Sequence, residues 1–306
     1  MVNVGIIGAD SPMAGEIIRI LINHPEVDIV SLFAPNLLGR NISSVHHGLI
    51  GENPLYFSDK INLEEVDFLA ITQPNEIAQN IIDKVLEKEN LKLTFFEDDF
   101  PQQTINENSE IGLSEINRKA LVRGAKMAFI PSPVAVPPLI SLVPLANFLL
   151  LNSDINIQVS LPADMSDKFN EDKEAKLIEN QLKEKQNSFN GKVKLKISSD
   201  HLSDRAQKTL ISLACSLPLD EIEKIYEQIY DDHNFTFLTR NAVNTAEVEG
   251  TQKTVINLNK PDSDTLIIET VSDARLRGGA GDVVHVMNLF FGLHEKTGLH
   301  LKPSRF

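Results

Sequence analysis

Apolar segments alternate with helical patterns over the first 130 residues. Mostly apolar runs occupy residues 2–7, 28–33, 66–71, 93–96 and 125–130. Between them, apolar residues recur at helical spacing in 16–21 and 75–88. Buried strands that alternate with helices in this way predict an α/β fold with a parallel, doubly wound sheet.

The pattern changes after residue 151. A strand with alternating apolar and polar residues is expected at 155–161, and a charge-dense segment, which suits an exposed helix, follows at 164–185. Its pairs Asp172/Lys176 and Glu179/Lys183 are four residues apart, a spacing typical of an exposed helix. Further strands are expected at 192–197, 208–217, 235–239, 253–258 and 264–271, with a helix at 219–230. This arrangement predicts a second, α+β domain.

The last stretch of the chain has the pattern of a buried helix. Residues 280–293 carry apolar side chains at helical spacing, namely Val283, Val284, Met287, Phe290 and Phe291. A chain of 306 residues is long for one hydrophobic core, so two domains of roughly 150 residues are expected.

Composition excludes several classes of partner. Hydrophobic residues make up 42% and charged residues 24% of the chain, as in an ordinary globular protein. The net charge is −14, from 29 basic and 43 acidic residues, which argues against nucleic acid or an anionic membrane as partner. We expect neither a signal peptide nor a membrane span. The single cysteine, Cys215, excludes an intramolecular disulfide, and a cytoplasmic location is expected.

A glycine turn follows the first expected strand and opens the first expected helix. Its residues are Gly8, Ala9, Asp10, Ser11, Pro12, Met13 and Ala14. A dinucleotide-binding fold places its phosphate-binding turn here, because the N–H groups and dipole of the helix meet the pyrophosphate. Only Gly8 keeps a usual glycine position, and Pro12 removes one donor. The turn therefore either binds a nucleotide or is a tight connection without a ligand.

The region after the second expected strand bears on the choice of cofactor. Residues 31–36 contain no acidic side chain placed for a ribose diol. Arg40 is the nearest cation for a 2′-phosphate. These two features favour NADP over NAD.

Several segments match a known family when they are taken together. They are residues 8–16, 21–27, 38–46, 112–117 and 277–293. The most specific is Arg277-Gly278-Gly279-Ala280-Gly281, which is similar to a lysine-glycine-alanine-alanine-glycine motif that precedes a C-terminal helix. On these segments the chain resembles N-acetyl-γ-glutamyl-phosphate reductase, of the wider semialdehyde dehydrogenase family. Residues 164–203 match poorly.

The resemblance implies a fold, a reaction and an assembly. The implied domains are a Rossmann-like one formed by 1–150 with the C-terminal helix 280–306 packed back on it, and an α+β one formed by 151–279. The implied enzyme belongs to amino-acid biosynthesis and reduces an acyl phosphate to a semialdehyde with NADPH. A cysteine thiolate attacks, phosphate leaves, hydride reduces the thioester, and a histidine acts as acid and base. A homodimer or homotetramer with a small-molecule ligand or substrate is implied as well.

The chain departs from this family where the chemistry lies. The family's asparagine-proline-glycine-cysteine-tyrosine-proline aligns with residues 132–137, so that Ala135 stands at the position of the nucleophilic cysteine. The family's histidine segment has no counterpart between residues 164 and 200. Ala274 stands where the family has an asparagine before its lysine-glycine run. Together these changes predict that the inherited reaction is lost.

Few other residues could replace the family's catalytic cysteine and histidine. Cys215 lies in an apolar, strand-like run, which indicates that it is a core residue. His201, with an aspartate close on either side, is the candidate base of the second domain. His46 and His47 either line the nucleotide cleft or lie on a surface loop. The acidic run 97–99 would need further ligands to bind a metal, so no metal site is expected.

Three functions remain open. The chain is a nucleotide-binding or regulatory paralogue without activity, that is, a pseudoenzyme. Alternatively it is an NADP-dependent oxidoreductase that transfers hydride directly to a carbonyl or imine and needs only a general acid. The third possibility is a working reductase with its cysteine elsewhere, but Cys215 lies about 80 residues from position 135. The altered glycine turn favours the first function.

Overall fold

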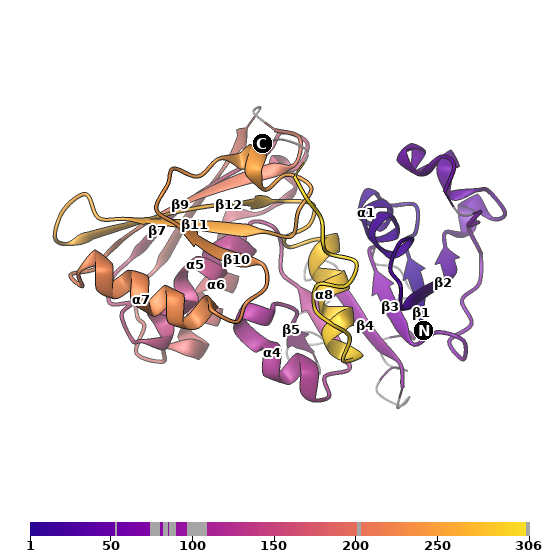
Figure 1. Cartoon of the computed structure of the whole chain (residues 1–306), viewed down its shortest axis with the longest axis horizontal. Coiled ribbons are helices and arrows are strands. Elements are labelled where there is room, and N and C mark those ends of the chain that lie inside the picture. The colour runs from indigo at the N-terminus through magenta and orange to yellow at the C-terminus, as the bar shows by residue number, and fades with distance from the viewer. Residues whose placement is uncertain are drawn as a thin grey trace. The chain divides into compact units, whose positions relative to one another are not determined.

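The chain forms two compact units, drawn in Figure 1. The computed structural model describes residues 1–52, 54–73, 80–81, 85, 90–96, 109–200 and 203–303, without the side chain of residue 200. Unit 1 consists of Met1–Pro131 and Gly279–His300, and unit 2 of Ser132–Gly278 and Leu301–Phe306. The division therefore falls before residue 132, whereas the sequence analysis placed residues up to 150 in the first domain.

Unit 1 is built on a parallel sheet of six strands in the order β2-β1-β3-β4-β6-β5. The strands are β1 (Val2–Ile7), β2 (Val27–Phe33), β3 (Phe68–Ile71), β4 (Lys92–Phe96), β5 (Glu110–Ile111) and β6 (Met127–Ile130). The chain moves outward from β1 to β2 and then returns to the other side at β3. This reversal makes the carboxyl ends of β1 and β3 the switch point of a doubly wound sheet. The predicted α/β class is confirmed.

Three helices of unit 1 are described in full: α1 (Pro12–Leu21), α4 (Ser114–Arg123) and α8 (Ala280–Phe290). The C-terminal helix α8 packs against α1, α4 and β4, and all of its residues are buried. Its last carbonyl, that of Phe290, accepts a hydrogen bond of 2.5 Å from Lys92 Nζ, which also lies over the rings of Phe290 and Phe291. The predicted return of this helix to the first domain is confirmed. Most of the helix expected at 75–88 lies outside the described residues.

A buried histidine joins the connection after α1 to α8. Glu26 N–H donates to Nδ1 of His24 at 3.2 Å, which leaves the proton on Nε2, 3.1 Å from Asn288 Oδ1. The amide of Asn288 in turn donates to the carbonyls of Glu295 and Thr297. Burial lowers the pKa of His24, although the bond to Asn288 and the charge of Glu26 act in the opposite direction.

This lowered pKa predicts a pH-dependent stability. In the unfolded chain His24 takes up a proton near its ordinary pKa of 6.5, whereas the folded protein resists protonation. The free energy of unfolding should therefore fall as the pH drops below 6.5. Chemical denaturation at pH about 7.5 and about 5.5 measures the loss. His24→Gln should flatten the dependence, and His300→Gln, at an exposed position, should leave it unchanged. An equally steep dependence in His24→Gln would contradict this account.

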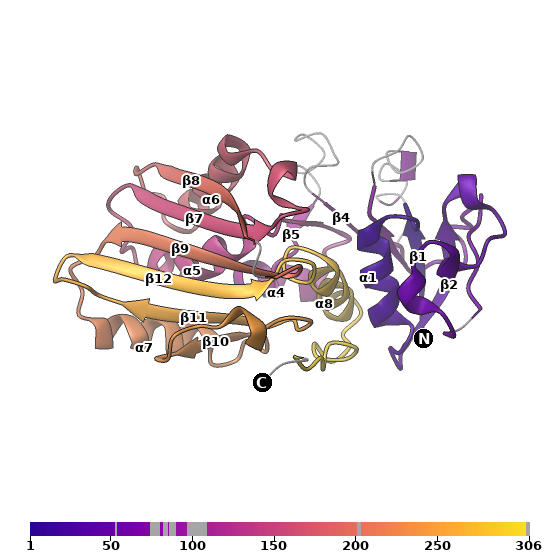
Figure 2. The same cartoon turned by 90° about the horizontal axis from the view of Figure 1, so that it is seen from above.

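Unit 2 is a mixed sheet in the order β10-β11-β12-β9-β7-β8, with helices on one face, as Figure 2 shows. Its strands are β7 (Ile155–Pro162), β8 (Val193–Asp200), β9 (Ala206–Ala214), β10 (Thr236–Thr239), β11 (Thr254–Asn259) and β12 (Thr265–Asp273). Its helices are α5 (Val136–Asn147), α6 (Glu171–Lys185) and α7 (Leu219–Tyr230). The predicted α+β second domain is confirmed. The charge-dense segment expected to be helical from 164 forms a helix only from Glu171, where Asn170 caps the Lys173 N–H at 3.0 Å.

Two tyrosine hydroxyl groups from α7 donate hydrogen bonds to backbone carbonyls of α5, one turn before a proline in that helix. Pro144 lies inside α5 and has no N–H, so the carbonyl of Ile140 loses its helical partner. The hydroxyl of Tyr230 donates to this carbonyl, and that of Tyr226, one turn earlier, donates to the carbonyl of Ser141. Tyr230 therefore satisfies a buried acceptor that the helix itself cannot, and Tyr226 adds a second contact to the next carbonyl.

Removing one of these hydroxyls has a predictable cost. Tyr230→Phe leaves the buried carbonyl of Ile140 without its donor and should lower the free energy of unfolding by ~1–3 kcal/mol. Tyr56→Phe is the matched control. Tyr56 is 56% exposed, so removing its hydroxyl should change the free energy of unfolding by less than ~0.5 kcal/mol. Equal effects of the two substitutions in urea denaturation would refute the role of Tyr230.

Candidate nucleotide-binding turn and the N-terminus of helix α5

The glycine turn lies at the switch point of the unit 1 sheet. Gly8 has φ +74°, and a Cβ at this position would come within 2.9 Å of both Thr72 Oγ1 and Gln73 Cβ. Only glycine combines this backbone conformation with so close an approach. Of the predicted residues 8–14, residues 8–11 thus form the turn between β1 and α1, and residues 12–14 begin α1.

A hydroxyl network spans the switch point. Ser11 is the N-cap of α1, and its Oγ accepts from Ala14 N–H at 3.0 Å. Ser11 Oγ also lies 2.8 Å from Thr72 Oγ1, which in turn is 2.8 Å from the carbonyl of Gly8. Thr72 directly follows β3 and was missed by the sequence analysis. A polar residue at the carboxyl end of a strand next to the glycine turn was the signal that could have found it.

Few backbone donors of the turn remain available to a ligand. Ala9 N–H donates to the carbonyl of Phe33, and Pro12 has no N–H. In the described part of the chain, the N–H groups of Asp10 and Met13 make no hydrogen bond. These two donors, with the positive end of the α1 dipole, are what a phosphate can meet. The carboxylate of Asp10 is exposed beside them and opposes an anion.

His46 packs on the turn, and Arg40 lies on the exposed loop after β2. Nε2 of His46 is 2.7 Å from the carbonyl of Ala9, and a Cβ on Gly15 would come within 2.6 Å of the same ring. Gly15 therefore makes room for an imidazole. His47 is exposed, 3.0 Å from the carbonyl of Ser43. Arg40 is held through its backbone to Leu37 and Phe57, so its side chain projects from an ordered loop.

Ala135 is the N-cap of α5 in unit 2 and is fully buried. Its N–H and that of Val136 both donate to the carbonyl of Ser132, at 3.0 Å each. The next two positions are Pro137 and Pro138, which have no N–H. The first turn of α5 consequently has a methyl group at its N-cap and no unbonded backbone donor for an oxyanion or thiolate.

Behind Ala135, a serine and a glutamate form a buried pair. Ser132 Oγ donates to Glu174 Oε2 at 2.5 Å and accepts from Ala135 N–H at 3.2 Å. Glu174, from α6, is only 3% exposed, although its helix was expected to be an exposed one. Gly278, with φ +71°, abuts the same backbone, since a Cβ there would lie 2.6 Å from Ser132 C and Pro133 Cα. The preceding Arg277 is fully buried.

The remaining predicted residues divide into three groups. His201 and the acidic run 97–99 lie outside the described residues. Cys215 is buried just after β9, and its N–H donates to the carbonyl of Asp264 at 2.7 Å. Ala274 is fully buried, with its N–H bonded to the carbonyl of Arg205. Within the described ranges, no cluster of three histidine, cysteine, aspartate or glutamate residues is placed to hold a metal, and no helix has the length and apolarity to cross a membrane.

Comparison with known proteins gives relatives along the whole chain. A family model described as semialdehyde dehydrogenase, NAD binding domain, matches residues 3–123. The chain is 32% identical to an N-acetyl-gamma-glutamyl-phosphate reductase of Parabacteroides distasonis over 326 aligned positions, which cover all of both proteins. A reductase of the same name from Flavobacterium johnsoniae is 30% identical over 333 positions with the same coverage.

Solved structures with similar folds are semialdehyde dehydrogenases. Aspartate semialdehyde dehydrogenase II of Vibrio cholerae, complexed with ASA, superposes with a TM-score of 0.72 at 12% identity and covers 95% of this chain and 98% of its own. The Candida albicans aspartate semialdehyde dehydrogenase with NADP gives 0.68 at 12% identity, with 95% and 99% covered. At such low identity these structures support the fold alone.

The strand order of unit 1 and the turn at its switch point define a Rossmann-like α/β protein with a second α+β unit. The chain belongs to the semialdehyde dehydrogenase family, among relatives named N-acetyl-gamma-glutamyl-phosphate reductase. The family resemblance expected from the sequence is thereby confirmed.

Proposed function

We propose that this chain is a nucleotide-binding member of the family that no longer reduces an acyl phosphate. The reaction that the family name implies needs a thiolate to form a thioester, and a methyl group cannot attack. The proposal rests on Ala135, which is the N-cap of α5 and stands where the sequence resemblance places the family's cysteine. The bonds of the Ala135 and Val136 N–H groups to the Ser132 carbonyl add to it, because they occupy two amide donors that could otherwise meet developing negative charge.

The turn between β1 and α1 supports retention of a nucleotide. The space at Gly8 and the unbonded N–H groups of Asp10 and Met13 fit a phosphate at the start of α1. We assign Gly8, Ala9, Asp10, Ser11, Pro12, Met13 and Ala14 to this contact. Arg40, on the loop after β2, would pair with a 2′-phosphate, so NADP is preferred over NAD. A bound nicotinamide nucleotide would supply hydride, and the residues of the turn would only bind and orient it.

The limited number of donors predicts weak binding. A complete glycine turn offers several N–H groups to the pyrophosphate, whereas here Pro12 and the Asp10 carboxylate both reduce its attraction. The proposal is therefore a protein that senses or binds the nucleotide, in a homodimer or homotetramer as the resemblance implies, and not one that turns it over rapidly.

Two measurements test the proposal. The first is a titration with NADPH followed by nucleotide fluorescence, which should give saturable binding that Arg40→Gln weakens. The second is incubation with N-acetyl-γ-glutamyl phosphate without nucleotide, followed by intact mass, which should show no acyl adduct. A covalent adduct would refute loss of the chemistry. No binding of NADPH would refute the nucleotide site, and binding with oxidation of NADPH by a ketone or imine would favour direct hydride transfer instead.

A further inference from the structure

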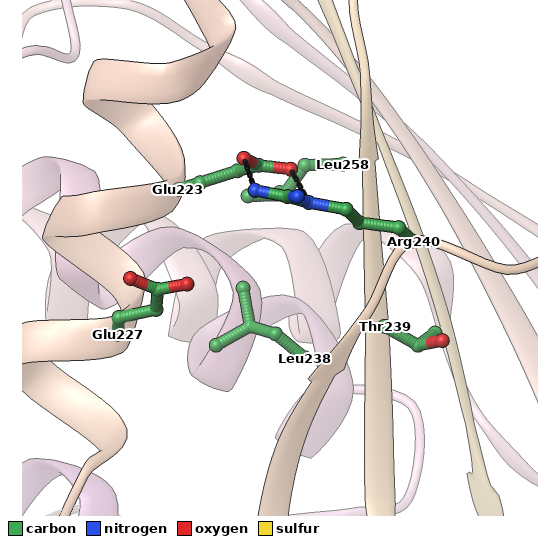
Figure 3. Close-up of a pocket in the computed structure, with 6 residues that line it drawn as sticks. All are labelled: Glu223, Glu227, Leu238, Thr239, Arg240 and Leu258. Atoms are coloured by element: carbon green, nitrogen blue, oxygen red, sulfur yellow. Dashed lines mark hydrogen bonds and ion pairs between the residues drawn. The ribbon is translucent and has the colours of Figure 1, made fainter.

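A cavity of about 220 Å³ lies wholly within unit 2, between α7 and strands β10 and β11. It is lined by Glu223, Glu227, Leu238, Thr239, Arg240 and Leu258. Figure 3 shows both glutamates projecting from successive turns of α7 and Leu238 pointing back toward them from β10. The cavity thus combines two carboxylates and a guanidinium with an apolar floor.

One of the two carboxylates forms an ion pair with the arginine. Glu223 accepts two hydrogen bonds from Arg240, from Nε at 3.1 Å and from Nη2 at 2.7 Å. This two-point contact raises the pKa of Arg240 and fixes the plane of its guanidinium. Nη1 takes part in neither bond, so its two protons remain available at the rim of the cavity. The Arg240 side chain is 81% exposed, and the edge of the guanidinium that Glu223 does not use can bind a carboxylate.

The second carboxylate has no such partner. Glu227 is exposed and makes no hydrogen bond or ion pair with the described residues, although its charge contributes to the raised pKa of Arg240. Counting Glu223, Glu227 and Arg240, the cavity carries a net charge of −1. Glu227 therefore favours a cationic group as its ligand.

The floor and the size of the cavity restrict the ligand further. Leu258 is 7% exposed, and Leu238 lies between the polar walls, so the floor can take an aliphatic chain. The side chain of Thr239 points away from the glutamates in Figure 3 and its Oγ1 accepts from Asn241 N–H. The cavity volume of about 220 Å³ suits a ligand of the size of one amino acid.

We propose that this cavity is a binding site for a free basic α-amino acid. The side-chain ammonium pairs with Glu227, the methylene groups lie over Leu238 and Leu258, and the α-carboxylate pairs with Arg240 Nη1. The site lies in unit 2 and uses no residue of the glycine turn. It goes beyond the proposed function and does not depend on it.

Isothermal titration at low salt with L-lysine as the probe tests the site. Two analogues separate the contacts, since L-norleucine lacks the side-chain ammonium and cadaverine lacks the carboxylate. L-lysine should bind saturably, and each analogue should bind about tenfold more weakly or not at all, because each lacks one charged hydrogen-bonding group. Failure of L-lysine to bind, or equal binding of L-norleucine, would overturn the proposal.

A pair of charge-neutralising variants locates the binding. Glu227→Gln keeps the shape of the side chain. It should weaken the binding of L-lysine about tenfold and leave the binding of L-norleucine unaffected. Glu221→Gln is the matched control, since Glu221 is exposed on the same helix and does not line the cavity. Equal losses in the two variants would overturn the site. Omitting NADPH from both titrations keeps this result separate from that of the nucleotide site.

Discussion

Gly278→Ala is expected to prevent unit 2 from folding. A Cβ at this position would come within 2.6 Å of Ser132 C and Pro133 Cα, and both are backbone atoms that cannot turn away as a side chain can. The residue also has φ +71°, which a side chain disfavours. We expect a loss of more than ~4 kcal/mol, seen as insoluble protein or as a large drop in the urea midpoint.

Gly250→Ala separates the two causes of this loss. Gly250 has nearly the same φ, +72°, but a Cβ there would meet no atom within 4 Å. The free energy of unfolding of this control should therefore fall only by the ~1–2 kcal/mol that a side chain costs in a left-handed backbone conformation. If both variants lost the same amount, the close approach to residues 132–133 would not be what the glycine at 278 provides.

Ala135→Cys is expected to restore the thiol without restoring the reaction. A cysteine thiolate at a helix N-terminus is stabilised by unbonded N–H groups and by the helix dipole. In α5, the N–H groups of Ala135 and Val136 are both bonded to the Ser132 carbonyl. The position is also fully buried, which favours the neutral thiol. The variant should gain no reductase activity above background.

The reactivity of the new thiol can be measured directly. At pH about 7, alkylation of Ala135→Cys by iodoacetamide should be more than ~10-fold slower than that of a free cysteine, whose pKa is about 8.5. The unchanged protein is the control, because its one thiol, Cys215, is buried and reports the background rate. Rapid alkylation, or turnover of the acyl phosphate by the variant, would show that the site is still organised for thiol chemistry.

Much of the architecture was predictable from local pattern. The apolar runs predicted the strands of both sheets except the two-residue β5, because the burial of a strand on one or both faces sets the order of its apolar residues. The glycine turn was found because β1 and α1 adjoin it in the chain. Ala135 was located through the aligned motif around it.

The contacts that shape the two candidate regions were not predictable, because they join distant residues. Thr72 meets Ser11 across 61 positions, His46 meets Ala9 across 37, and Glu174 meets Ser132 across 42. Charge pattern indicated that α6 is exposed, but Glu174 of that helix is buried and accepts a hydrogen bond from Ser132. Such pairs follow from the packing of elements within each unit, and not from any local periodicity.

The central claim is that the chain keeps the family's fold and nucleotide turn but has lost its thiol chemistry. The most direct test is phosphate-dependent reduction of NADP with N-acetylglutamyl semialdehyde, at protein concentrations close to those of the nucleotide. We predict saturable NADPH binding and no formation of NADPH in this reaction, with unchanged protein and with Cys215→Ser alike. Sustained turnover by the unchanged protein, whether or not Cys215→Ser abolishes it, would contradict the account.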